Sequence, residues 1–88
     1  MVKGKTRTGF EFEYDESVID DMEFLELAAS VENDVTKMPK LLNSVLGEDQ
    51  KKRLYEHVRA ENGRVPTQAV SDEMEDVFAA AGDQAKNS

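Results

Sequence analysis

The spacing of the apolar residues changes at Tyr14, and this change limits what the chain can fold into. Before it, residues of one parity are aromatic or β-branched and those of the other are mostly charged: the first set is Thr6, Thr8, Phe10, Phe12 and Tyr14. Alternation with a period of two is typical of a half-buried strand. Beyond Tyr14 the apolar residues recur every three or four positions, which is typical of helices. The sequence therefore predicts a short β region followed by helices.

The β region is predicted to be a hairpin over residues 2–15. A strand over 10–14 carries the alternation, and Thr8-Gly9 lies where a turn would fold residues 2–6 back against it. Because a two-stranded hairpin is barely stable by itself in water, helices must pack on its apolar face.

Four short helices are predicted after the hairpin, over residues 17–31, 35–46, 49–62 and 66–81. Ser17, followed by aspartates that suit the positive end of the helix dipole, is predicted to cap the first helix. Pro39 must lie in the first turn of the second helix, because a deeper proline would remove a backbone hydrogen bond. Pro66 is predicted to begin the fourth. The residues predicted to end the last three helices are Gly47, Gly63 and Gly82.

The predicted fold class is thus mainly α (α+β), a small N-terminal β-hairpin followed by a compact bundle of about four short helices. A chain of 88 residues has room for one small domain, which we place at 1–82. Residues 83–88 are predicted to form a flexible C-terminal tail.

Charge and composition exclude several classes of function. The chain has 19 acidic and 11 basic residues, for a net charge of −8. Between Phe10 and Asp34 acidic residues recur with no basic residue among them. Such a chain gains no counterion-release energy from phosphates, so we expect no nucleic-acid or anionic-membrane binding. With no cysteine and no apolar run of membrane-spanning length, the sequence predicts a soluble, cytoplasmic protein without disulfides.

No pattern in the sequence predicts catalysis. His57 is the only histidine, so a transition-metal site would have to depend on carboxylates alone. The acidic cluster between Asp15 and Glu23 has apolar residues where an EF-hand needs ligands, and it lacks the central glycine. No glycine-rich phosphate loop is present. We therefore expect no catalytic residue, no metal site and no cofactor, and we expect that the protein is not an enzyme.

The first predicted helix carries two adjoining apolar stripes. One stripe comprises Val18, Met22, Leu25 and Ala29, and the other comprises Phe24, Leu27, Ala28 and Val31. A single core-facing stripe needs only the first set, so the second set is our candidate partner-binding face. The alternative is that both stripes belong to the core. An acidic domain with a spare apolar face would bind a helix, more readily a basic one, although such a face could also serve self-association.

The order of several segments resembles a known family. A strand at 9–16 precedes the segment LLNSVLG at 41–47, which continues into QKKRLY at 50–55. NGRVP follows at 62–66, and an apolar helix runs from Val70 to Phe78. From about Gly9 to Gly82 the chain resembles the tail assembly chaperones of long-tailed bacteriophages and prophages, which are encoded just before the tape-measure protein.

This resemblance implies a non-enzymatic role in tail morphogenesis. Such chaperones bind the long, apolar, helical tape-measure protein, help to recruit subunits of the tail tube (the major tail protein), and leave before the tail is finished. It also implies that the protein acts in the bacterial host cytoplasm and is absent from the mature virion. The alternative is an acidic protein-binding module or DNA mimic that inhibits a host nucleic-acid-binding protein. A small hydrolase ranks last, because it needs catalytic groups that the sequence lacks.

Overall fold

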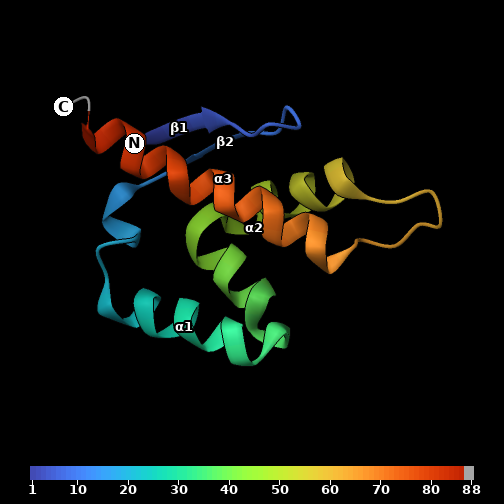
Figure 1. Cartoon of the computed structure of the whole chain (residues 1–88), viewed down its shortest axis with the longest axis horizontal. Coiled ribbons are helices and arrows are strands. Elements are labelled where there is room, and N and C mark those ends of the chain that lie inside the picture. Colours follow the sequence, from blue (N-terminus) through green and yellow to red (C-terminus); the bar gives the residue numbers. More distant parts are fainter. Residues whose placement is uncertain (87–88) are drawn as a thin grey trace.

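The computed structural model describes residues 1–86 and is mainly helical, with a two-stranded hairpin at its N-terminus (Figure 1). In chain order the elements are β1 (Val2–Lys5), β2 (Glu11–Tyr14), η1 (Glu16–Val18), α1 (Met22–Asn33), η2 (Val35–Lys37), α2 (Met38–Val58) and α3 (Thr67–Lys86). The elements η1 and η2 are short 3-10 turns. The predicted class is therefore confirmed, but the described residues form three α-helices rather than four.

The hairpin follows the predicted alternation. β1 and β2 pair antiparallel, with Val2 opposite Tyr14 and Gly4 opposite Phe12. The predicted turn is confirmed: the N–H of Gly9 donates to the Thr6 carbonyl at 2.9 Å, and Gly9 has a φ of 94°. The ring of Phe12 lies so close to β1 that a Cβ on Gly4 would come within 2.9 Å of Phe12 Cζ.

One face of the hairpin is covered by two helices. β1 packs against α3 and β2 packs against α2, and Figure 1 shows α3 running along the hairpin. Val2, Phe12 and Tyr14 are buried on this face. The Tyr14 hydroxyl donates to the carbonyl of Val77 at 2.9 Å, and burial raises the pKa of this phenol above its ordinary value. The helices thus supply the support that the short hairpin requires.

The first helix begins later than predicted, and Ser17 is not its cap. Asp15 caps the turn η1 by accepting from the N–H of Ser17 at 2.9 Å. Asp21 then caps α1 by accepting from the N–H of Glu23 at 3.1 Å. Because an aspartate accepts the N–H two residues ahead of it, each of these residues begins a separate element. The predicted helix over 17–31 is therefore a 3-10 turn followed by α1.

A bend at Gly47 joins two of the predicted helices into α2. Gly47 has a φ of 78° and a ψ of 169°, yet helix continues on both sides of it. This backbone region is available essentially to glycine alone. The helices predicted at 35–46 and 49–62 are therefore the two arms of α2. The regular helix is interrupted at Gly47, as predicted, but the second arm follows at a kink without an intervening loop. Pro39 lies in the first turn, as predicted.

Both ends of the α2–α3 connection also differ from the prediction. α2 ends at Val58, and Gly63 belongs to the loop that follows. There the N–H of Ala60 donates to the carbonyl of Arg64 at 2.8 Å. α3 begins after Pro66, whose carbonyl accepts the N–H of Val70 at 3.2 Å.

α3 passes through Gly82, which was predicted to end it, and continues to Lys86. Gly82 is not among the glycines with positive φ, so it has no helix-ending conformation. Residues 83–86 of the predicted flexible tail are therefore helical, and the remainder of that tail, 87–88, lies outside the described residues.

Every α-helix and both strands contribute to one core. Its most deeply buried side chains are Val2, Leu42, Leu54 and Val77. α1 joins the core through Phe24, whose ring meets that of Phe78 in α3 edge-on at 5.8 Å. In the described part of the chain, every helix is too short or too polar to span a bilayer.

The bend predicts that replacing Gly47 and replacing Gly82 by alanine will have opposite effects on the free energy of unfolding. A Cβ added at Gly47 or at Gly82 would meet no atom within 4 Å. Gly47→Ala must place a side chain at positive φ, so we expect a loss of about 1–3 kcal/mol in the free energy of unfolding. Gly82→Ala is the matched control and should raise it by about 0.5–1 kcal/mol, because alanine is the better helix former. Urea denaturation measures both changes, and equal effects would contradict the strained bend.

Candidate functional site

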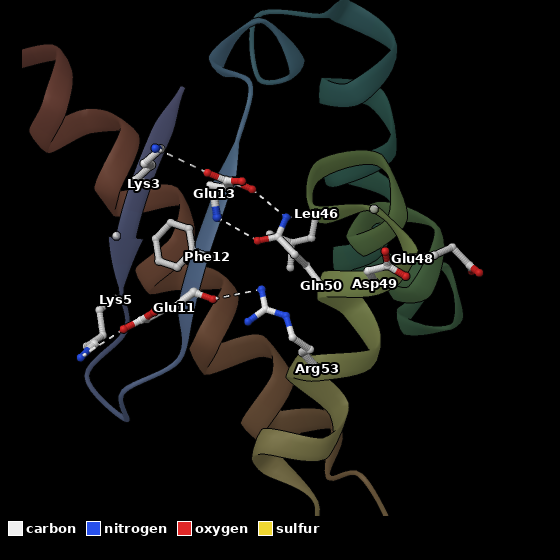
Figure 2. A pocket seen from close by; sticks show the side chains of 12 residues that line it. Lys3, Lys5, Glu11, Phe12, Glu13, Leu46, Glu48, Asp49, Gln50 and Arg53 are labelled. Atoms are coloured by element: carbon white, nitrogen blue, oxygen red, sulfur yellow. Dashed lines mark hydrogen bonds and ion pairs between the residues drawn. The ribbon is translucent and has the colours of Figure 1, made fainter.

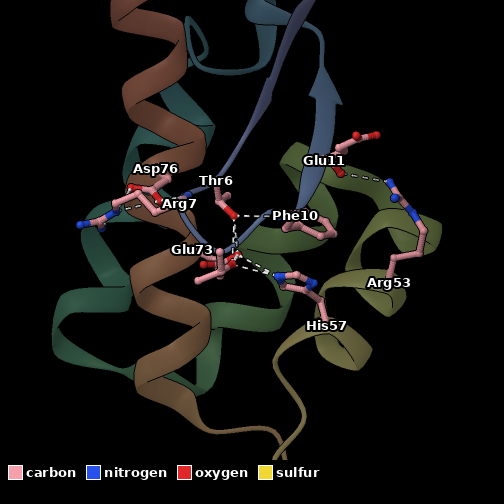
Figure 3. Close-up of polar contacts among 9 residues, drawn as sticks. Thr6, Arg7, Phe10, Glu11, Arg53, His57, Glu73 and Asp76 are labelled. Atoms are coloured by element: carbon pink, nitrogen blue, oxygen red, sulfur yellow. Dashed lines mark hydrogen bonds and ion pairs between the residues drawn. The ribbon is translucent and has the colours of Figure 1, made fainter.

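A buried carboxylate organises the polar groups nearest the hairpin turn (Figure 3). Glu73 of α3 is only 2% exposed. Its Oε1 accepts hydrogen bonds from the hydroxyls of Thr6 and Thr8, each at 2.8 Å. His57 of α2 lies beside them, with Nε2 2.8 Å from Thr8 Oγ1 and 3.9 Å from Glu73 Oε1. Three segments that are distant in the sequence therefore meet at this carboxylate.

The arrangement of Thr8, His57 and Glu73 differs from a catalytic triad. Thr8 Oγ1 lies 2.8 Å from both Glu73 Oε1 and His57 Nε2. In a triad the orienting carboxylate meets the ring nitrogen opposite the hydroxyl, whereas Glu73 lies on the same Nε2 side as Thr8. The network therefore fixes the hairpin turn to α2 and α3.

An ion pair fixes the same turn from outside. Asp76 of α3 accepts from the backbone N–H of Arg7 at 3.0 Å and from its Nε at 3.1 Å. First the backbone N–H of Arg7, then its guanidinium, hold the pKa of Asp76 below its ordinary value. The ionised carboxylate therefore favours the folded state.

An open groove of about 670 Å³ lies between the hairpin and the bend of α2 (Figure 2). The side-chain amide of Gln50 pairs with the backbone of Glu13, accepting from its N–H at 2.8 Å and donating to its carbonyl at 2.7 Å. Across the hairpin, Lys3 pairs with Glu13 at 3.8 Å and Lys5 pairs with Glu11 at 3.6 Å. These polar groups therefore bond to the groove's own walls and to one another, and they do not converge on a ligand position.

The structure places the four predicted partner-binding residues on the inner side of α1. Phe24 is 7% exposed. Leu27, Ala28 and Val31 are partly buried and pack against the core. Phe24 and Leu27 also line a groove of about 440 Å³ toward α2, together with Val18 and the polar residues Asp21, Glu23, Lys40 and Ser44. Binding of a partner by the four residues stays a prediction.

The stripe that we expected to face the core is instead largely exposed. Met22 is 69% exposed and Leu25 is 49% exposed. Ala29 is exposed as well, and within this stripe only Val18, in η1, packs against the core. The expectation was wrong because the edge contact between Phe24 and Phe78 turns the other stripe inward. The stripe that we expected to be free for a partner therefore faces the core, and the stripe that we expected in the core is exposed.

The exposed apolar side chains are concentrated in one part of the molecule. Four large apolar side chains are exposed in the described residues, and three of them lie on α1 or directly after it: Met22, Leu25 and Val35, the last 50% exposed. Sequence reasoning assigned the first two to the core. A signal was present, since Glu26 and Glu32 fall on the same side of the helical wheel as Met22 and Leu25.

Comparisons with known proteins identify no relative of this chain. The chain matches no protein-family model, no curated protein and no solved structure. Among the side chains that the structure describes, no three histidine, aspartate or glutamate residues gather as a metal site requires. The candidate functional site is the exposed apolar surface of α1, because three of the four large apolar side chains exposed in the described residues lie on this helix or directly after it.

The buried network predicts that Thr6→Val will be costly although valine has nearly the same shape. Thr6 is 4% exposed, and its oxygen also accepts from the N–H of Phe10 at 3.1 Å. The variant leaves that N–H unpaired and removes one donor from Glu73, so the free energy of unfolding should fall by about 1–3 kcal/mol. Thr8→Val is the comparison, with a smaller expected loss because Thr8 is exposed and water can replace its hydroxyl. Urea denaturation would contradict this role if Thr6→Val cost no more than Thr8→Val.

The Arg7–Asp76 contact predicts a stability difference that depends on pH. Because the pKa of Asp76 is lowered in the folded state from its ordinary value of 3.8, the contribution is complete above that value. It is lost as the pH falls through the folded-state pKa. Asp76→Asn should therefore lower the urea midpoint at pH 7, and its difference from wild type should shrink below pH 4. Glu61→Gln, in the α2–α3 loop, is the control. An equal deficit for Asp76→Asn at pH 3 and pH 7 would contradict the prediction.

Proposed function

We propose that this protein is a non-enzymatic tail assembly chaperone of a long-tailed phage or prophage. It binds the tape-measure protein in the bacterial host cytoplasm, helps to recruit tail-tube subunits, and is absent from the mature virion. Its role is to cover apolar helical segments of the client until the tube is built around them.

The observation that carries the proposal is the concentration of exposed apolar side chains on α1. Met22 is 69% exposed and Leu25 is 49% exposed, whereas the side chains of the core are each 7% exposed or less. Methionine adapts its shape to irregular apolar surfaces, and a client with many different helical segments requires such adaptation. The resemblance of residues 9–82 to the chaperone family supports the same role independently.

The fold suits this task physically. Figure 1 shows α1 on the side of the molecule opposite the hairpin, so a client helix on its outer surface need not disturb the hairpin network. The net charge of −8 would keep a complex with an apolar client in solution through mutual repulsion.

A second candidate is an acidic module or DNA mimic that inhibits a host nucleic-acid-binding protein. It is favoured by α1, where Glu23, Glu26 and Glu32 are exposed. Mimicry would depend on charge alone and would be lost at high salt, whereas apolar capture of a helix would persist.

Co-expression with the tape-measure protein encoded downstream tests the leading proposal. The client should be soluble with the wild-type protein and insoluble without it. Met22→Glu and Leu25→Glu should abolish this effect while leaving the fold intact, because both residues are exposed and glutamate is a good helix former. Phe24→Glu is unsuitable, since Phe24 is buried and the variant would unfold.

Thr67→Glu is the matched control, because it adds the same charge in the first turn of α3, where a carboxylate is favourable. It should solubilise the client as well as wild type does. If the client's solubility does not depend on the protein, or if all three variants act alike, the chaperone proposal is wrong.

A further inference from the structure

The outward face of α1, which we define as Met22, Leu25 and Ala29, forms one continuous stripe. These residues follow one another at spacings of three and four, so they lie on one side of the helix. All three are exposed. α1 is 12 residues long, which corresponds to about 18 Å at 1.5 Å per residue. The stripe itself spans the seven residue steps from Met22 to Ala29, about 10 Å, which is long enough to contact about two turns of another helix.

Exposed glutamates border this stripe on both sides. On the helical wheel Glu32 falls on one side of it and Glu26 on the other, with Glu23 further round the second side. α1 itself carries no basic residue. An apolar partner that covered the stripe would therefore bring its own flanking residues against carboxylates.

The acids of α1 differ from those of the hairpin strands. The hairpin acids Glu11 and Glu13 pair with Lys5 and Lys3, and in α2 Glu48 and Glu56 pair with Lys51 and Arg59. In the part of the chain that the structure describes, neither Glu23, Glu26 nor Glu32 forms an ion pair. The negative charge beside the apolar stripe is thus left for a partner to neutralise.

From this juxtaposition we infer that the outward face of α1 docks a basic amphipathic helix. Its apolar residues cover Met22 and Leu25, and lysine or arginine at its flanking positions meets Glu26 and Glu32. This inference rests on the proposed function and specifies which segments of the client are bound. Segments with acidic flanks are rejected, because like charges would face each other beside the apolar contact.

The same charges argue against a second copy of the chain as the occupant. Two outward faces in contact would oppose Glu26 and Glu32 to the same acids of the other copy, with no base on either α1. Burial of the apolar stripe supplies the affinity for a basic helix, while the flanking charges raise its association rate and select its sequence.

Two designed peptides test the inference by fluorescence anisotropy with the full chain. Both are 18-residue helices with the same leucine stripe, and their flanks carry either lysine or glutamate. A third peptide has the composition of the lysine peptide in a scrambled order without a stripe. The lysine peptide should bind at least about tenfold more tightly than the other two.

Leu25→Glu separates docking from general attraction to an acidic protein. It makes the face more negative, so attraction by charge alone would strengthen binding of the lysine peptide. Docking instead predicts at least about tenfold weaker binding, through loss of the apolar contact. The double variant Glu26→Gln/Glu32→Gln should weaken binding several-fold at low salt and less at high salt. Glu61→Gln, distant in sequence from α1, should have no effect.

The inference is overturned if the lysine and glutamate peptides bind equally, if neither binds, or if Leu25→Glu strengthens binding. These outcomes are separate from failure of the proposed function. If the tape-measure protein is solubilised in a Leu25-dependent way but the peptides are not distinguished, only the charge selection fails. If the lysine peptide binds α1 but the tape-measure protein is not solubilised, the outward face still binds basic helices and the chaperone role is wrong.

Discussion

The bend at Gly47 is the constraint on which the rest of the structure depends. A straight helix of 21 residues would be about 30 Å long and would follow one direction. With the bend, the first arm of α2 packs against α1, where Lys40 and Ser44 line a groove together with Phe24 and Leu27. The second arm reaches the hairpin, where Gln50 and His57 bond to Glu13 and Thr8. One helix therefore supports both ends of a small domain, and a glycine-only backbone conformation makes this possible.

On the hairpin side of the molecule, the polar side chains form hydrogen bonds and ion pairs with other groups of the same chain. Glu73 gathers Thr6, Thr8 and His57, and among the described residues no buried polar side-chain atom lacks a hydrogen-bond partner. Such a satisfied network specifies one position for the hairpin on α2 and α3. It places a histidine beside a hydroxyl and a carboxylate, as some active sites do, but the carboxylate and the hydroxyl meet the same ring nitrogen, which differs from the geometry of a catalytic triad. The same side also holds the cross-strand ion pairs and the Arg7–Asp76 pair.

The α1 side has the opposite character. There the structure leaves Met22 and Leu25 exposed and the neighbouring glutamates without ion pairs among the described residues. A helix presented in this way gives a partner both apolar area and charge, and no contact made by the hairpin has to be broken for the partner to bind. On the hairpin side the polar groups are paired within the chain, whereas on the α1 side apolar side chains and carboxylates are exposed. This difference is the physical basis of the functional proposals.

The sequence by itself determined the elements whose causes are local. Alternation from Thr6 to Tyr14 predicted the buried face of the hairpin, because side chains in a strand alternate sides whatever they pack against. It predicted the interruption of the helix at Gly47 but did not determine the direction of the second arm, which packing against the hairpin decides. The glutamates beside Met22 and Leu25 favour the other stripe of α1 as the inner one, but only the tertiary contact between Phe24 and Phe78 decides which stripe lies inside. The burial of Glu73 depends on Thr6 and Thr8, more than 60 residues away along the chain, and only the tertiary structure brings them together.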